Sequence, residues 1–518
     1  MSSAARPLSE SQQGVPVLQA ARAHRLALAA LTIAILAFVS RIWVSTTTGS
    51  TAEDFLITLR YARNIAQGLG FVYNPGHRVL GTTTPLYTLL LALFASMRLN
   101  AGLCGKLLNI AADSLTCWLI WRTLASRKIG LPWAGLAAAL LYAVGSTPIN
   151  ISTGGMESGL VTCVSLGAIL AFIEDQPTLM CLLGSLLFLL RIDGLLLLAL
   201  LVIFWVLRNR CVPWRGVAAS LLVALPWVIW ATVYFGSPIP LSLVAKLTVY
   251  GRGLTLRAMN LKAFEQQFLR GAVQLGLTCC FLVGAARIFQ RNRHLTGLPL
   301  LAPALLWLAI YYVTMLTSHV PAFAWYFLPP WPVFLIVAGI GGDAVVRFAI
   351  AHLGDSTRSR LQGVGPVALA GAALVGAVHV RSVRADVAHT QWVENTLRRP
   401  MGIWFREHAA RNERIFLEPI GYVGYYSHRP ILDQIALVSP EVLASYRTAQ
   451  PLGDIVRRLR PDWLCLRPAE IRTLGRQGVP LPSSKYLFVR SFRVPGRPPD
   501  FYVFHRHPEP AVTSRSYP

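Results

Sequence analysis

Apolar runs long enough to cross a lipid bilayer recur through the first 380 residues of this 518-residue chain. A membrane-spanning helix needs about 20 consecutive apolar residues. Only 14% of the residues are charged, whereas soluble proteins carry about 25%. The sequence therefore predicts a mainly α-helical polytopic membrane protein. The predicted spanning segments lie near residues 26–44, 103–124, 132–150, 157–173, 179–190, 194–208, 216–235, 268–288, 298–317, 326–346 and 364–380.

The basic residues set the orientation of these segments. The formal net charge is +25. Nucleic-acid-binding proteins are also basic but do not carry such apolar runs, so no nucleic-acid partner is expected. Cytoplasmic loops are enriched in Lys and Arg, and about eleven crossings satisfy this rule if the stretch 84–97 enters the membrane only partway. The cytoplasmic loops then contain Arg122, Arg127 and Lys128; Arg208, Arg210 and Arg215; Arg287, Arg291 and Arg293; and Arg347, Arg358 and Arg360.

The same patterns divide the chain into parts. Residues 1–25 form a cytoplasmic tail, residues 26–380 form the transmembrane module, and residues 45–83 form its first outside loop. Residues 381–518 contain no spanning run and alternate between helix-like and strand-like patterns. We expect a C-terminal periplasmic α/β domain on a multi-pass protein of the bacterial inner membrane, with the N-terminus in the cytoplasm.

Two adjacent carboxylates, Glu53 and Asp54, begin the first outside loop. They precede an amphipathic helix predicted over residues 55–67, and acidic residues stabilise a helix N-terminus. Alternatively, one of them is a general base, because inverting sugar transfer needs a carboxylate to accept the proton of the attacking hydroxyl. In lipid-linked sugar donors the leaving group is a phosphate, which departs without a general acid, so one carboxylate suffices. Asp54 and Glu53 are therefore the candidate catalytic residues.

Charged residues also lie at the predicted membrane surface elsewhere, where they are costly and often functional. Arg191 and Asp193 occupy a hairpin tip between two short apolar helices. They either pair with each other to close the hairpin, or Arg191 binds a lipid phosphate, for which a guanidinium is well suited. Lys246, in a predicted interfacial helix, either extends to the headgroups or is a second phosphate ligand.

Weaker candidates fall on the same predicted side of the membrane. Glu157 lies at a helix start, where it either caps the helix or faces the same cavity as the acidic pair. His319 lies in an outside turn, and Tyr326 follows it closely. The candidate cavity-lining residues are Arg60, Glu157, Asp193, His319 and Tyr326.

Several segments recur, in the same order, in one known family. They are Glu53-Asp54-Phe55-Leu56-Ile57-Thr58-Leu59-Arg60, Gly68 to Gly76, Gly154-Gly155-Met156-Glu157, Arg191-Ile192-Asp193-Gly194, Tyr234 to Pro238, Ile420-Gly421-Tyr422 and Arg429 to Asp433. With them the chain resembles GT-C glycosyltransferases, most closely mycobacterial terminal β-(1→2) arabinofuranosyltransferases and bacterial relatives. Those relatives usually read Asp-Asp at positions 53 and 54, and proline in place of Ile192.

This resemblance implies a GT-C fold, a polyprenyl-phosphate sugar donor and inverting transfer in the periplasm. The base is then Asp54, and we expect Arg191 and Lys246, the phosphate-binding candidates named above, to hold the donor phosphate. The sugar expected first is arabinofuranose, and the acceptor is a glycan, lipopolysaccharide or protein. Some GT-C enzymes use a divalent metal, but no Cys or His cluster in this sequence indicates a metal site, and no cofactor is required.

Two other classes of protein stay open. A transporter or flippase of lipid-linked sugars would show inverted repeats, broken helices and charges at the bilayer midplane. No repeat is evident, and the candidate residues gather at one membrane face. A non-catalytic scaffold, whose outside domain binds a partner, predicts that Asp54 is dispensable.

Overall fold

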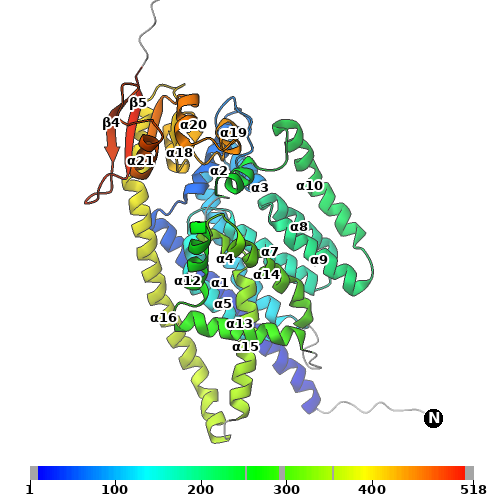
Figure 1. The fold of residues 1–518 in the computed structure, drawn as a ribbon. Coiled ribbons are helices and arrows are strands. Elements are labelled where there is room, and N and C mark those ends of the chain that lie inside the picture. Colours follow the sequence, from blue (N-terminus) through cyan, green and yellow to red (C-terminus); the bar gives the residue numbers. More distant parts are fainter. Residues whose placement is uncertain (1–9, 251–253, 291–297, 353–354, 508–518) are drawn as a thin grey trace, which may run out of the picture.

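The structure is a computed structural model that describes residues 10–250, 254–290, 298–352 and 355–507. A helical module carries a small α/β domain at one end, which we call the domain side (Figure 1). The apolar segments form the helices α1 (Glu10–Thr48), α4 (Ala101–Ala125), α5 (Pro132–Val144), α6 (Ser146–Thr153), α7 (Ser158–Ile173), α8 (Pro177–Leu190), α9 (Gly194–Asn209), α10 (Trp214–Phe235), α13 (Ala272–Phe289), α14 (Ala302–Thr317), α15 (Trp331–Ala351) and α16 (Asp355–Thr396).

The chain is a multi-pass membrane protein. Six helices in the described ranges are long and apolar enough to cross a membrane, and counting the bent pair α5–α6 as one span gives seven. α7, α8 and α9 are apolar but shorter, so the number of eleven crossings stays a prediction. The predicted spanning segment 132–150 corresponds to the bent pair α5–α6, which breaks at Gly145 with a bend of 53°. Pro148 explains the break, because proline cannot continue the hydrogen bonding of a helix interior.

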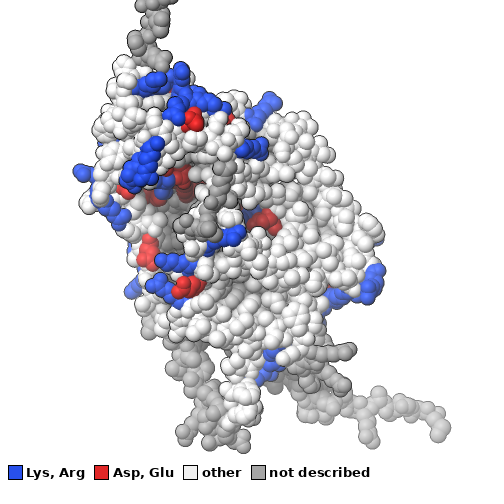
Figure 2. Space-filling model, in the orientation of Figure 1, with Lys and Arg blue, Asp and Glu red and all other residues white. Residues whose placement is uncertain are grey.

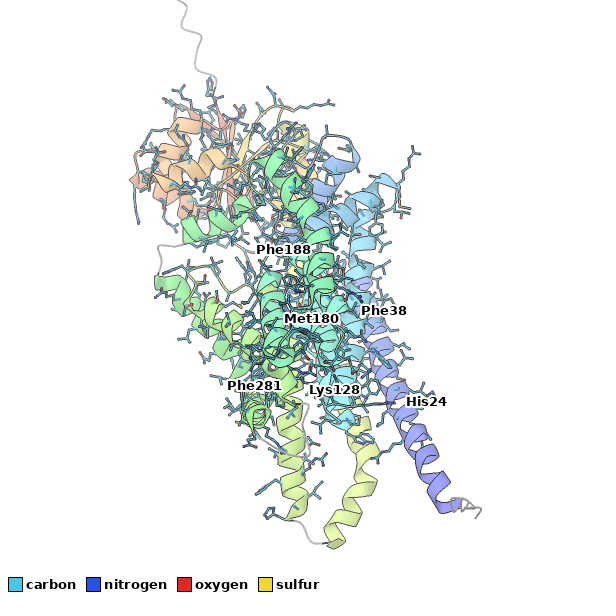
Figure 3. The ribbon with its side chains drawn as sticks, turned by 90° about the vertical axis from the view of Figure 1, so that its right-hand side faces the viewer. His24, Phe38, Lys128, Met180, Phe188 and Phe281 are labelled. Carbon is cyan, nitrogen blue, oxygen red and sulfur yellow. The ribbon has the colours of Figure 1, made fainter. Side chains whose placement is uncertain are left out.

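Charged residues are unevenly distributed over the molecule. Figure 2 shows Lys, Arg, Asp and Glu gathered on the α/β domain and around a hollow below it, above a broad belt with few charges. Figure 3 shows Lys128 and His24 toward the opposite end of the module from the domain. At that end Lys128 pairs with Asp175, and Arg208 lies 2.9 Å from the same carboxylate. The basic loop before α5 and the end of α9 therefore lie on the side away from the domain.

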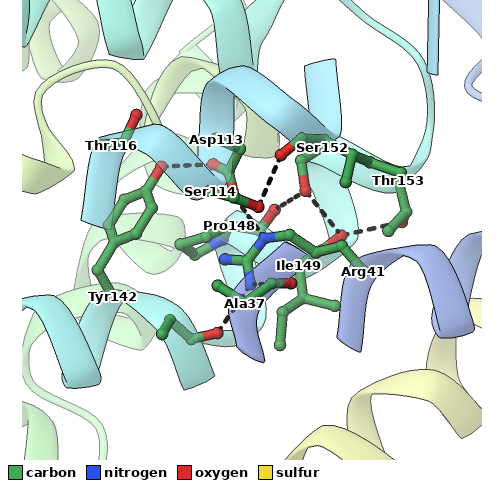
Figure 4. Close-up of polar contacts among 12 residues, drawn as sticks. Ala37, Arg41, Asp113, Ser114, Thr116, Tyr142, Pro148, Ile149, Ser152 and Thr153 are labelled. Atoms are coloured by element: carbon green, nitrogen blue, oxygen red, sulfur yellow. Dashed lines mark hydrogen bonds and ion pairs between the residues drawn. The ribbon is translucent and has the colours of Figure 1, made fainter. Parts of the chain in front are cut away.

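A buried polar network joins three helices of the module. Arg41 of α1 pairs with Asp113 of α4, and both side chains are fully buried. Tyr142 of α5 donates to Asp113, and Arg41 Nη1 donates to the carbonyl of Ala143 at 3.0 Å (Figure 4). A buried charge is costly unless it is paired, so this network fixes α1, α4 and the end of α5 relative to one another.

Short helices connect the spanning ones. They are α2 (Glu53–Ala66), α3 (Pro85–Ser96), α11 (Leu241–Tyr250), α12 (Leu254–Phe268), η1 (Leu298–Leu301) and η2 (Ala324–Tyr326). α2 begins two residues before the predicted helix, so both acidic residues lie in its first turn. α3 has only 12 residues, too few to cross a bilayer.

The α/β domain is built on a five-stranded sheet of order β2-β1-β3-β5-β4. Its strands are β1 (Ile415–Leu417), β2 (Ile431–Asp433), β3 (Trp463–Leu466), β4 (Tyr486–Phe492) and β5 (Phe501–Arg506). β1 pairs in parallel with β2 and β3, and β5 is antiparallel to β3 and β4. The parallel strands are buried throughout, as sheets covered on both faces are.

Five helices surround this sheet: α17 (Arg398–His408), α18 (Gly421–Ser427), α19 (Pro440–Arg447), α20 (Leu452–Leu459) and α21 (Pro468–Arg476). The long helix α16 rises from the module into the domain and passes through residue 381. The boundary predicted there falls inside a helix, and the division of the chain into domains stays a prediction.

Candidate functional site

A cavity of about 190 Å³ opens on the domain side of the module. It is enclosed by the first turn of α2, the loops before α3 and α7, the hairpin between α8 and α9, α11 and η2. The α/β domain adds one residue, Leu437, from the loop after β2. The cavity therefore lies where the first loop, the module and the domain meet.

Asp54 lines this cavity from the first turn of α2. It is half-buried, and its carboxylate makes no hydrogen bond or ion pair with any described residue. A carboxylate at the start of a helix is stabilised as an anion by the helix dipole. Asp54 therefore presents hydrogen-bond acceptors that are open to a ligand in the cavity.

Arg191 reaches the cavity from the hairpin between α8 and α9. Its guanidinium donates to both oxygens of Asp193, from Nε at 3.1 Å and from Nη2 at 3.0 Å. Nη1 lies 3.5 Å from Glu157 Oε1, and the ring of Tyr326 lies 5.2 Å from the guanidinium carbon. The Arg191–Asp193 pair does close the hairpin, and Arg191 nevertheless lines the cavity.

Lys246 enters from α11 on another side of the cavity. Its ammonium lies 5.7 Å from the ring centre of Phe323. Although burial lowers the pKa of Lys246, the neighbouring oxygens of Tyr326 and Asp54 raise it above its ordinary value. Lys246 is therefore a cation held near the Asp54 carboxylate.

Glu157 lines the cavity at the start of α7. Burial raises the pKa of its carboxyl, the charge of Arg191 opposes this rise, and Asp54 adds to it. The lining contains three carboxylates and two cations, so the net charge is negative while all are ionised. Arg191 pairs with two of these carboxylates, Glu157 and Asp193.

Sequence reasoning missed several lining residues. Thr82, Thr83 and Thr84 contribute hydroxyls from the loop before α3, and Trp325 contributes an aromatic ring that stacks on Phe323 with centroids 4.5 Å apart. Ser242 of α11 also lines the cavity, and its buried hydroxyl has no hydrogen-bond partner within the described chain. The run of three threonines was a signal that could have been used.

Three predicted residues do not line the cavity. Glu53 points to α18 of the domain, where its carboxylate accepts the amide of Gly421, and burial raises its pKa to about 7. Arg60 is fully buried and donates to the carbonyls of Tyr73 and Gly424, because its helix face packs on the domain. His319 lies 3.1 Å from a guanidinium nitrogen of Arg257 on α12.

The described residues contain no group of three or more His, Cys, Asp or Glu side chains placed to hold a metal ion. Of the three carboxylates that line the cavity, Glu157 and Asp193 both pair with Arg191, so only Asp54 would be left to bind a metal ion. A divalent metal does not fit this donor set, and no chemical step is derived through one.

Comparisons with known proteins bear on the fold. A family model described as a domain of unknown function (DUF8728) matches residues 384–507. No curated protein matches the sequence significantly. The structure of ArnT from Cupriavidus metallidurans bound to undecaprenyl phosphate superposes with a TM-score of 0.56 at 13% identity, over 92% of this chain and 97% of ArnT. The chain has the GT-C fold.

A second GT-C structure agrees with this assignment. The archaeal oligosaccharyltransferase AglB from Archaeoglobus fulgidus, in complex with an inhibitory peptide and a dolichol-phosphate, superposes with a TM-score of 0.51 at 12% identity, over 84% of this chain and 69% of AglB. The mycobacterial arabinofuranosyltransferase AftD aligns with a TM-score of 0.49 at 15% identity, over 94% of this chain and 41% of AftD. That weaker likeness does not bear on the sugar.

Proposed function

We propose that this GT-C protein is an inverting glycosyltransferase that moves a sugar from a polyprenyl-phosphate donor to an acceptor hydroxyl. The observation that carries the proposal is the cavity itself, where Asp54, which has no partner among the described residues, shares one space with the cations Lys246 and Arg191. The ArnT structure contains undecaprenyl phosphate and the AglB structure a dolichol-phosphate. These lipids support a lipid-linked donor here.

In the proposed reaction the acceptor oxygen attacks the anomeric carbon of the donor. Asp54 takes the proton of the acceptor hydroxyl as the new glycosidic bond forms. The bond between the anomeric carbon and the phosphate oxygen breaks, and its electron pair leaves with the polyprenyl phosphate. Lys246 and Arg191 stabilise the negative charge on that phosphate, which is the kind of preorganised electrostatic stabilisation that enzymes rely on.

The finer assignments rest on the motif resemblance. Arabinofuranose is the sugar we place first, and the acceptor is a glycan, lipopolysaccharide or protein at the cell surface. The first loop would lie on the periplasmic face of the bacterial inner membrane, with the N-terminus in the cytoplasm and the α/β domain in the periplasm. The basic loops on the side away from the domain support this orientation.

The test is transfer by the purified protein in detergent, with synthetic polyprenyl-phospho-arabinofuranose and an extract of candidate acceptors. We expect Asp54→Asn to lose transfer by about 10²- to 10⁴-fold, the usual contribution of a general base, while donor binding is kept. Asp454→Asn, which removes an exposed carboxylate of the domain paired with Arg457, is the matched control and should transfer normally.

Each other outcome has a defined meaning. Equal transfer by wild type and Asp54→Asn would remove Asp54 as the base. If wild type transfers no arabinose, the same assay is repeated with other lipid-linked sugars. Failure with all of them, together with movement of the lipid-linked sugar across liposomes that contain the protein, would favour the flippase alternative.

A further inference from the structure

The first turn of α2 is tied directly to α18 of the domain. Glu53 Oε1 accepts the backbone amide of Gly421, and the amide of Tyr422 lies 3.3 Å from both carboxylate oxygens. Arg398 Nη1 lies 3.8 Å from Glu53 Oε2. Glu53 belongs to α2, but its carboxylate accepts the amides at the start of α18. A negative charge at the N-terminus of a helix is stabilising.

The backbones at this contact are unusually close. A Cβ atom on Gly421 would lie 2.1 Å from the carbonyl oxygen of Glu53 and 2.8 Å from its Cδ. Gly421 does not have a positive φ, so its backbone conformation would suit alanine. Only the approach of α2 requires glycine at this position.

Further hydrogen bonds hold the same two elements together. Tyr73 of the first loop donates its hydroxyl to the carbonyl of Ile420 at 2.7 Å. Arg60 Nη1 donates to the carbonyl of Gly424 at 2.6 Å. Just before α2, the hydroxyl of Tyr422 donates to the carbonyl of Thr51 at 2.8 Å. α18 is therefore fixed against α2 and against the residues on both sides of it.

Glu53 and Asp54 point in different directions because they are consecutive in a helix. Successive side chains of an α-helix are about 100° apart, at 3.6 residues per turn. Glu53 points to α18, whereas Asp54 points into the cavity. Any rotation or shift of the first turn that broke the Glu53 contact would also move the Asp54 carboxylate.

We propose that α18 holds the first turn of α2 in place, and that Glu53 is the positioning residue through which the domain orients Asp54. This inference rests on the proposed function, since it makes Asp54 the group that must be oriented. It gives the unit at residues 384–507, which matches a family of unknown function, a role inside the reaction: it keeps the base in line with the acceptor hydroxyl.

The experiment uses the full-length protein in nanodiscs with the variants Glu53→Ala and Gly421→Ala. Gly475→Ala is the matched control. Gly475 lies in α21, another helix of the same domain, and a Cβ atom there would have no atom within 4 Å. Amide hydrogen exchange of peptides covering α2 and α18 measures the contact without reference to any activity. Steady-state transfer then gives kcat and the KM for the donor.

We expect exchange at α2 and α18 to speed up at least tenfold in both variants and to stay unchanged in Gly475→Ala. We expect kcat to fall about 10- to 100-fold while the donor KM changes less than threefold, because Arg191 and Lys246 are untouched. Glu53→Gln keeps an oxygen for the Gly421 amide, so it should recover most of kcat.

Several results would overturn the inference. Unchanged exchange in both variants would show that the contact does not hold α2. Faster exchange with normal kcat would show that Asp54 does not depend on it, and a parallel loss of kcat and donor binding would indicate general unfolding instead. If wild type transfers no sugar, the proposed function fails, but the exchange measurement still decides whether α18 holds α2.

Discussion

At the scale of single residues, Arg191 both closes the hairpin between α8 and α9 and lines the cavity. Its guanidinium binds Asp193 through two nitrogens and Glu157 through a third, with only 9% of the side chain exposed. A planar fork can make such contacts while one edge still faces a ligand, and a lysine ammonium cannot. The geometry of this one side chain therefore matters more than its charge.

Replacing Arg191 by lysine keeps the charge and removes the fork. We expect Arg191→Lys to bind a polyprenyl-phosphate donor about tenfold more weakly, which corresponds to about 1.4 kcal/mol, and to lower the thermal midpoint of unfolding. Arg122→Lys is the control, because Arg122 makes a single contact with Glu174 at the other end of the module and is 40% exposed. Donor affinity equal to wild type in Arg191→Lys would contradict a phosphate-binding role.

The cavity residues differ in how far the sequence could predict them. Asp54, Arg191 and Lys246 were predicted because a charged residue at a membrane surface stands out against apolar neighbours. Leu437 could not be predicted, since it reaches the cavity from a distant part of the chain and is an ordinary apolar residue. The sequence also could not predict that the Glu53 side chain points away from the cavity, because this depends on the packing of α18 against α2.

At the scale of elements, the loop after β2 depends on one buried carboxyl. Asp433 has no exposed surface, and it accepts the amides of Ile435, at 2.9 Å, and Leu437. Burial raises the pKa of Asp433 from 3.8 to about 7, although those amides lower it. The loop that brings Leu437 to the cavity is thus organised around a titratable group.

This raised pKa has a definite consequence for stability. A carboxyl whose pKa is higher in the folded state binds its proton more tightly there, so its contribution to stability is fully present below about pH 4 and is lost as pH rises through about 7. We expect the thermal midpoint of the wild type to fall between pH 5 and 8, and the fall to be smaller in Asp433→Asn. Parallel curves for the two proteins would show that Asp433 does not titrate in this range.

Elements with strong periodicity were predicted well, and those stabilised only by tertiary contacts were not. The apolar helices and the mixture of helices and strands after residue 381 follow from apolar runs and alternation, while the number of membrane crossings stays a prediction. α18 was missed because it has only seven residues, two of them the glycines Gly421 and Gly424, and glycine disfavours helix. Its helix exists because α2 and the first loop bind its backbone.

At the scale of the whole molecule, the Arg41–Asp113 pair connects α1 to α4 inside the membrane module (Figure 4). Breaking a buried pair leaves one charge without a partner, at a cost of about 3–5 kcal/mol, whereas replacing both partners by apolar residues is often neutral. We expect Arg41→Met and Asp113→Leu each to lower the thermal midpoint strongly, and the double variant to recover most of the loss.

This double-mutant cycle is measured by thermal unfolding of the four purified proteins in one detergent. Additive losses in the double variant would show that the two side chains stabilise the fold independently. That result would contradict the network as a joint support for α1, α4 and the end of α5. The GT-C fold as a whole was predictable from the order of its motifs, whereas this network was not, because Arg41 and Asp113 lie 72 residues apart and meet only where α1 packs on α4.

The neighbouring positions of Glu53 and Asp54 also constrain how such proteins can be recombined. Glu53, which binds α18, and Asp54, which lines the cavity, are adjacent in the chain. Inserting one residue between them would turn one of the two side chains away from its present contact. A chimera that exchanges residues 384–507 between relatives must therefore bring its own version of the first loop. The first loop and the domain would be inherited as a unit, although Glu53 and Gly421 lie 368 residues apart in the sequence.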